Sequence, residues 1–188
     1  MKQQIVTTLL SVSLAAIMAG AQSTADKAAP QVHDYWVDPA TNLMWAAKDN
    51  GKDVSWKGAI KYCRKSNLAG YSGWRMANLD ELQGLYDKSL ETAGMAGDKR
   101  HYRPFTWRIK GNIFLTGNEW TTLQRVDDRG KPSGYEYYFD FNEGRADNDP
   151  TGWPYSYDGM RVLCVRGAEA SPNHTTKDFR PIQLKNLN

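Results

Sequence analysis

The sequence has few of the features that would point directly to a defined chemistry. Its three histidines, His33, His101 and His174, lie far apart along the chain, which argues against a metal centre built from histidine. The formal net charge is only +3, which argues against a strongly basic nucleic-acid-binding surface. After residue 21 no run approaches eighteen apolar residues, so no later segment is predicted to cross a membrane. Internal repeats and Gly-X-Y runs are also missing.

The composition describes a small, aromatic-rich globular domain. The 188 residues leave room for about one domain. The hydrophobic fraction is 40% and the charged fraction is 24%, both near the average of folded proteins. These values exclude disorder as a description of the whole chain, but they do not name an activity.

Residues 1–21 have the pattern of a secretory signal peptide. Lys2 provides a positive start, residues 5–18 are mostly apolar, and Ala19-Gly20-Ala21 gives the small-residue pattern of a cleavage site. No cysteine lies at this site, which argues against a lipid anchor. We therefore predict an exported protein, periplasmic or extracellular, with a loose lead-in over residues 22–33. The alternative is a buried N-terminal helix.

Cys63 and Cys164 are the only two cysteines. Because exported proteins meet oxidising conditions, the pair is predicted to form one disulfide. The loop-entropy model gives such a long-range bridge a stabilising effect of about 4.7 kcal/mol. The alternatives are two free buried thiols or a reactive cysteine pair.

The first half of the chain predicts a β-hairpin followed by two helices. Residues 34–37 and 43–46 have the character of strands joined by a tight turn. Ser55 is typical of an N-cap, and the apolar residues after it have the i, i+3, i+4, i+7 spacing of one helix face. That face consists of Trp56, Ala59, Ile60 and Cys63. Asn78, with Glu81 three residues later, predicts a second helix that begins with a capping box.

The second half predicts strands separated by long loops. Residues 94–117, which contain Pro104 and several glycines, are predicted to be irregular. Strands are predicted over residues 119–125, 134–141 and 160–166. The loop at 142–158 and the tail after Gly167 are polar. The succession of strands, two helices and further strands indicates an α+β fold.

Several short pieces occur in a characteristic order along residues 34–167. They are Thr41-Asn42-Leu43-Met44-Trp45, Trp56 with Ala59 and Tyr62-Cys63, Ala69-Gly70-Tyr71 with Trp74-Arg75, Asp80-Glu81-Leu82, Trp120-Thr121-Thr122, and Phe141 with Gly144 before Arg161-Val162-Leu163-Cys164-Val165-Arg166. Together they resemble the Lcl C-terminal domain family, named for a bacterial collagen-like adhesin that binds sulfated polysaccharide. This chain lacks the collagen-like stalk.

The resemblance implies a C-type-lectin-like fold, with two helices packed on small antiparallel sheets and long irregular loops. It also supports a Cys63–Cys164 bridge, at positions that match the family's helix and last-strand cysteines. Because family members are mostly binding modules, the resemblance supplies no active site. Asn42 stands where the family usually has glycine, a mild change because both residues accept a positive φ. Residues 168–188 then form a C-terminal extension.

The strongest local charge signal is the basic segment, residues 98–110. It combines five bases with one acid and interleaved aromatic rings. The bases are Lys99, Arg100, Arg103, Arg108 and Lys110, and the aromatics are Tyr102, Phe105 and Trp107. Because arginine matches sulfate and phosphate geometry and flat rings pack on sugars, we predict that this segment binds an anionic polysaccharide. The alternative is a solvated loop whose aromatic residues enter the core.

An acidic stretch follows at residues 140–149. Its carboxylates are Asp140, Glu143, Asp147 and Asp149. Such oxygens suit calcium, with Asp147 and Asp149 as candidate ligands, but the paired Glu-Pro-Asn or Gln-Pro-Asp motif of sugar-binding C-type lectins is missing. We predict no cofactor, with calcium as the alternative. Trp153 and Tyr155 are predicted to stack on sugar, or alternatively to pack down and anchor the loop.

These observations predict a non-catalytic binding module. The two cysteines are assigned to a bridge, and the separated histidines do not support a Ser-His-Asp triad. The expected partner is a polyanionic or surface polysaccharide, and nucleic acid is not expected. The alternatives are a module that binds an acidic protein of the cell envelope, and an enzyme of unknown class.

Overall fold

The computed structural model describes residues 34–97, 101–151, 159–168, 175–176 and 182–183. The predicted signal peptide and lead-in lie outside these residues, as do Lys99, Arg100, Trp153 and Tyr155. The described residues belong to one compact unit, Val32–Asn188. Within them, no helix has the length and apolar character needed to span a membrane.

Both helices begin at the predicted caps. They are α1 (Trp56–Lys65) and α2 (Leu79–Leu85). The Ser55 hydroxyl accepts a hydrogen bond from the Gly58 amide at 3.3 Å. At α2, the Asn78 side chain accepts from the Glu81 amide at 2.8 Å, and the Glu81 carboxylate accepts from the Asn78 amide at 2.9 Å. The two helices and the capping box are therefore confirmed.

A four-stranded sheet has the order β1-β2-β10-β3. Its strands are β1 (Tyr35–Val37), β2 (Met44–Ala46), β3 (Arg75–Met76) and β10 (Cys164–Arg166). The β1–β2 hairpin is the predicted one, and Asn42 in its turn has a φ of 58°. This is the positive φ that glycine adopts without strain, so asparagine fills the same backbone role here.

A six-stranded sheet has the order β11-β6-β7-β8-β12, and β9 also pairs with β6. Its strands are β6 (Asn118–Val126), β7 (Pro132–Asp140), β8 (Arg145–Pro150), β9 (Met160–Arg161), β11 (Thr175–Thr176) and β12 (Ile182–Gln183). The C-terminal extension therefore supplies a partner to β6 and another to β8.

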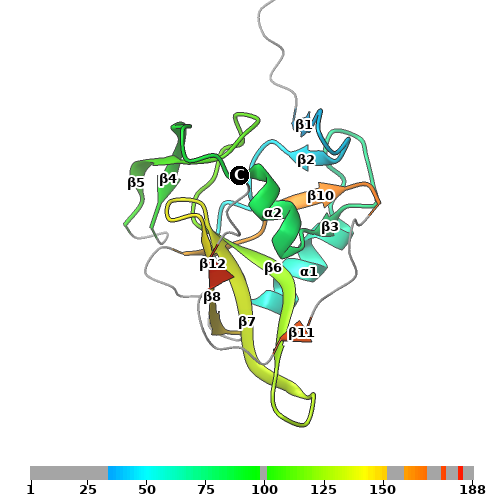
Figure 1. The fold of residues 1–188 in the computed structure, drawn as a ribbon. Coiled ribbons are helices and arrows are strands. Elements are labelled where there is room, and N and C mark those ends of the chain that lie inside the picture. The colour runs from blue at the N-terminus through cyan, green and yellow to red at the C-terminus, as the bar shows by residue number, and fades with distance from the viewer. Residues whose placement is uncertain (1–33, 98–100, 152–158, 169–174, 177–181, 184–188) are drawn as a thin grey trace, which may run out of the picture. The chain divides into compact units, whose positions relative to one another are not determined.

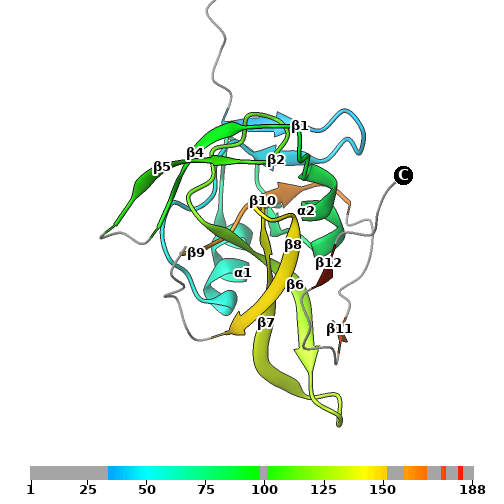
Figure 2. The ribbon, with the colours of Figure 1, turned by 60° about the vertical axis from the view of Figure 1, so that its left-hand side comes forward.

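A separate hairpin completes the sheets. It consists of β4 (Thr92–Ala96) and β5 (Arg103–Trp107). Figures 1 and 2 show this hairpin and β1–β2 at one end of the unit, while the turn between β6 and β7 extends at the other end. α2 packs against β6 and β7, and α1 packs against β3.

The structure corrects three predictions for the second half of the chain. Residues 94–117 are not irregular throughout, because they contribute to β4 and β5. Gly94 is required for packing, since a Cβ there would lie 2.6 Å from the Trp107 ring. The polar stretch 142–158 contains β8, which is held by its ladder to β7. The predicted strand 160–166 divides into β9 and β10, because its two ends pair with different sheets.

The core draws on both helices and all three sheets. Its largest buried side chains include Trp45, Trp74, Trp120, Tyr137 and Phe139. The Cys63–Cys164 disulfide joins α1 to β10, with the two Cα atoms 5.5 Å apart. The predicted bridge and the α+β class are thus confirmed.

Candidate functional site

The structure gives different surroundings to the described cations of the basic segment. Arg103 is exposed on β5, and its guanidinium lies 5.4 Å from the centre of the Phe105 ring. The Arg108 guanidinium donates to the Asn142 carbonyl, and Lys110 Nζ donates to the Gly84 carbonyl at 2.8 Å. Arg108 and Lys110 are therefore tied to backbone oxygens of neighbouring elements, while Arg103 has no hydrogen bond or ion pair with the described residues.

The aromatic residues of this segment also divide. Trp107 is only 2% exposed, and its indole N–H lies 3.0 Å from the Met95 carbonyl oxygen. It belongs to the core and offers no ring face to a ligand. Tyr102 is 37% exposed and donates to the Gly51 carbonyl at 2.9 Å. Of these two predicted contact residues, only Tyr102 reaches the surface.

A fully buried arginine, Arg161, contacts the turn end of the β4–β5 hairpin. Its guanidinium donates to the Gly97 carbonyl at 2.8 Å and to the Tyr102 hydroxyl at 2.9 Å. It also forms an ion pair with Asp53 and donates to the Thr116 hydroxyl at 2.8 Å. Sequence reasoning placed Arg161 in a strand and missed this role, because its partners come from four separate parts of the chain.

Two buried acids lie beside this arginine network. Asp49 accepts hydrogen bonds from Thr116 and Gly51, yet burial raises the pKa of its carboxyl above the usual value. Glu119 is fully buried, and burial followed by the neighbouring Asp49 charge raises the pKa of Glu119 well above its usual range. Burial of this kind favours the neutral form of a carboxyl.

A group of exposed cations lies on α1, which sequence reasoning did not single out. This α1 face consists of Lys57, Lys61, Arg64 and Lys65. All four side chains are exposed, and none has a hydrogen bond or ion pair with the residues that the structure describes. No acid occurs in the ten residues of the helix. The spacing i, i+4, i+7, i+8 places the four charges on one side of a helix, and this signal was present in the sequence.

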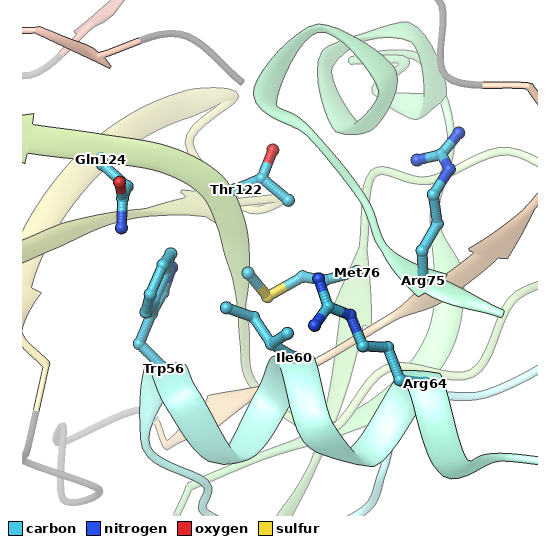
Figure 3. A pocket seen from close by; sticks show the side chains of 7 residues that line it. All are labelled: Trp56, Ile60, Arg64, Arg75, Met76, Thr122 and Gln124. Atoms are coloured by element: carbon cyan, nitrogen blue, oxygen red, sulfur yellow. The ribbon is translucent and has the colours of Figure 1, made fainter. Parts of the chain in front are cut away.

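A cavity of about 200 Å³ opens between α1, β3 and β6 (Figure 3). This α1 cavity is lined by Trp56, Ile60, Arg64, Arg75, Met76, Thr122 and Gln124. Figure 3 shows Arg64 rising from α1 beside Met76, with Thr122 and Gln124 facing it from β6. The Thr122 hydroxyl oxygen is buried without a hydrogen-bond partner.

The two arginines of this cavity differ in availability. Arg75 is bound to the Glu81 carboxylate by two hydrogen bonds, of 2.8 and 2.6 Å. Figure 3 shows its guanidinium turned away from that of Arg64. Arg64 is therefore the arginine that can bind an incoming anion, with an apolar wall from Trp56 and Ile60 next to it.

The acidic stretch is largely engaged in local contacts. Arg145 forms ion pairs with Glu143 and with Asp147, the latter at 3.0 Å. Burial, followed by the Asp147 charge, raises the pKa of Asp149 above its usual value. Among the described residues no group of three or more potential ligands could hold a metal ion. The absence of a cofactor stays a prediction, with calcium at Asp147 and Asp149 as its alternative.

Taken as a class, the molecule is a disulfide-bridged α+β domain that presents four exposed cations on one helix. The family model of the Lcl C-terminal domain matches residues 34–166, and the chain belongs to this family. The chain matches no curated protein and no solved structure. The resemblance seen in the sequence is thus confirmed at the level of the family.

Proposed function

We propose that this protein is an exported, non-catalytic module with a C-type-lectin-like fold that binds anionic surface polysaccharide. The observation that carries the proposal is the α1 face, Lys57, Lys61, Arg64 and Lys65. Four exposed cations without acidic neighbours on the same helix attract a polyanion and release its counterions on contact.

The α1 cavity extends this proposal from charge to shape. Arg64 lies on both the α1 face and the cavity wall. One charged sugar unit would place its sulfate or carboxylate on Arg64 and a ring face toward Trp56 and Ile60.

The β4–β5 hairpin provides a second contact region in the proposal. Arg103 is its exposed described guanidinium, and Tyr102 its exposed ring. The sequence prediction adds Lys99 and Arg100, which lie between β4 and β5 in the sequence, and, as further proposed contacts, Trp153 and Tyr155. Export is supported by the signal-peptide pattern of residues 1–21 together with the disulfide, which is typical of oxidising compartments.

The test is retention of the protein on immobilised heparin and on unsulfated dextran across a salt series. We expect retention on heparin only, falling steeply with salt. The double reversal Lys61→Glu/Arg64→Glu should abolish retention at moderate salt. Its matched control, Lys88→Glu/Lys131→Glu, makes the same charge change at exposed positions elsewhere and should lose much less.

Two outcomes would overturn the proposal in different ways. Equal losses in the α1 variant and its control would show that only net charge matters. No retention of the unaltered protein would turn attention to an acidic envelope protein as partner. In the same assay, the loss of heparin retention in Arg103→Glu measures how much the β4–β5 hairpin contributes to binding.

A further inference from the structure

Side chains four residues apart on α1 form two neighbouring rows along the helix axis, and the two rows differ in chemistry. One row lines the α1 cavity and consists of Trp56, Ile60 and Arg64. The three lysines of the α1 face form the other row, which lies at the next position round the helix and outside the cavity lining. A polyanion meets the lysine row whatever its sugar units are. Selectivity among polyanions therefore depends on the row inside the cavity.

The α1 cavity has two ends of different chemistry (Figure 3). Trp56 and Gln124 lie at one end and Arg64 at the other, with Ile60 between them. Both charged lining residues, Arg64 and Arg75, lie at the same end. Trp56 and Arg64 are eight positions apart on α1, which corresponds to about 12 Å at the helical rise. A ligand that spans this length meets a cation at one end and uncharged side chains at the other.

Gln124 is the hydrogen-bonding side chain at the uncharged end. It projects from β6 on the Trp56 side of the cavity and is half-buried. The Trp56 indole N–H donates to the Thr121 carbonyl of the same strand at 2.8 Å, so this ring lies against β6. The Gln124 amide has no hydrogen-bond partner within the part of the chain that the structure describes. An amide offers two donor hydrogens and an acceptor oxygen, which suit the hydroxyl and acetamido groups of a neutral sugar.

We propose that the α1 cavity selects a polysaccharide in which anionic and neutral sugar units alternate, and that Gln124 determines this preference. The acidic group of one unit binds Arg64, and the adjoining neutral unit contacts Trp56 and hydrogen-bonds Gln124. A second anionic unit at the Gln124 end would lose hydration without gaining a cation from the lining. This inference rests on the proposed function and names the class of polyanion for the same site.

Two probes of equal length separate this preference from attraction by charge alone. A hyaluronan tetrasaccharide alternates a carboxylated unit with N-acetylglucosamine, whereas tetragalacturonate carries a carboxylate on every unit. Charge alone favours tetragalacturonate, because its charge is twice as high. We expect calorimetric titration of the full protein at fixed salt to show the opposite order. Hyaluronan tetrasaccharide should bind more tightly by about threefold or more, the effect of one net hydrogen bond.

Gln124→Met is the decisive variant, because it keeps the size of the side chain and removes the amide. It should weaken hyaluronan binding about threefold to tenfold and leave tetragalacturonate binding unchanged. Gln83→Met makes the same change on α2, outside the cavity lining, and is the matched control. Arg64→Gln should weaken both probes, since each probe places a carboxylate at Arg64.

The outcomes distinguish this inference from the proposed function. Tetragalacturonate binding as tightly as hyaluronan, or an equal loss of both probes in Gln124→Met, would overturn the alternating class and the role of Gln124. Binding of neither probe would also overturn this inference, while retention on heparin would still support a polyanion module. Failure of the unaltered protein to bind heparin would instead overturn the proposed function itself.

Discussion

The α1 face and the basic segment carry similar charge in the sequence but offer it very differently in the structure. The α1 bases stand on one helix without partners, and a cavity opens beside Arg64. In the basic segment, Arg108 and Lys110 are bound to carbonyl oxygens, and Trp107 is buried. The difference teaches that a local count of bases does not measure available charge. What matters is how many of those bases already have a partner.

Breaking the disulfide is expected to have the largest effect, because the bridge anchors α1 to β10. Cys63→Ser/Cys164→Ser should lower the free energy of unfolding by about 2–5 kcal/mol, measured by urea unfolding. Retention on heparin should then fall more than it does for Arg103→Glu, since the α1 face loses its support. Reduction of the unaltered protein is the control and should reproduce the loss. An unchanged urea midpoint in Cys63→Ser/Cys164→Ser would show that the bridge adds no stability.

Removing the buried Arg161 should affect the region of the β4–β5 hairpin, which contains part of the basic segment. Arg161→Met leaves Asp53 without its ion pair and should destabilise the protein by about 3–5 kcal/mol. Amides of β4 and β5 should exchange hydrogen faster relative to those of α1, because Gly97 and Tyr102 lose their anchor. Arg161→Met/Asp53→Asn should recover part of the stability. If the double variant were no more stable than Arg161→Met, the unpaired Asp53 carboxylate would not be the cause of the destabilisation.

The stability of the folded protein should depend on pH, because its core contains two buried acids with raised pKa values. Burial raises the pKa of Glu136 to about 7, and the pKa of Glu119 is raised well above its usual range. The folded state therefore binds more protons than the unfolded state above about pH 4.5, the ordinary value. Stability is fully present below this pH and should fall as the pH rises through about 7.

Thermal melting across this pH range tests the effect. Glu136→Gln stays neutral at every pH, so its melting temperature should depend less on pH than that of the unaltered protein. Asp127→Asn, at an exposed turn, is the control and should keep the original slope. A rise in stability with pH would contradict the assignment of both buried acids.

A smaller effect is expected from single neutral substitutions in the two regions. Arg108→Gln should change heparin retention by less than about twofold, because its guanidinium is already bound to Asn142. Lys61→Gln removes the same charge from the α1 face and should reduce retention more. Equal effects of the two variants would remove the distinction between free and engaged bases.

Calcium is expected to have the smallest effect. Glu143 and Asp147 already pair with Arg145, which leaves few oxygens free to coordinate an ion. Added calcium should therefore leave the melting temperature unchanged. A rise that saturates with calcium would revive Asp147 and Asp149 as ligands, since a ligand bound only by the folded state stabilises it.

The predictable parts of the fold depend on signals between neighbouring residues. Ser55 and Asn78 mark the helix starts through contacts three residues away, and Asn42 marks the first hairpin. The disulfide followed from having only two cysteines. The α1 face was also available from spacing alone, but the bases at 98–110 are more numerous and alternate with aromatic residues, which made them the more obvious signal.

The unpredicted parts depend on contacts between distant residues. β8 is polar and gains its place from the ladder to β7. Gly94 had the character of a break in the chain, although it makes room for the Trp107 ring. The partners of Arg161 are set by packing across the whole unit. No local pattern in the sequence carries such information.

The position of the disulfide has a mechanical consequence. Its two sulfur atoms join residues 101 positions apart, so the chain between them forms a closed covalent loop. A pulling force applied at the two ends passes through the β1–β2 hairpin, the first turns of α1, the bridge and β10. Most of the six-stranded sheet and the β4–β5 hairpin lie inside the loop and bear none of the tension along the backbone. Under load, such a domain can lengthen only by the segments outside its bridge until the sulfur–sulfur bond is cut.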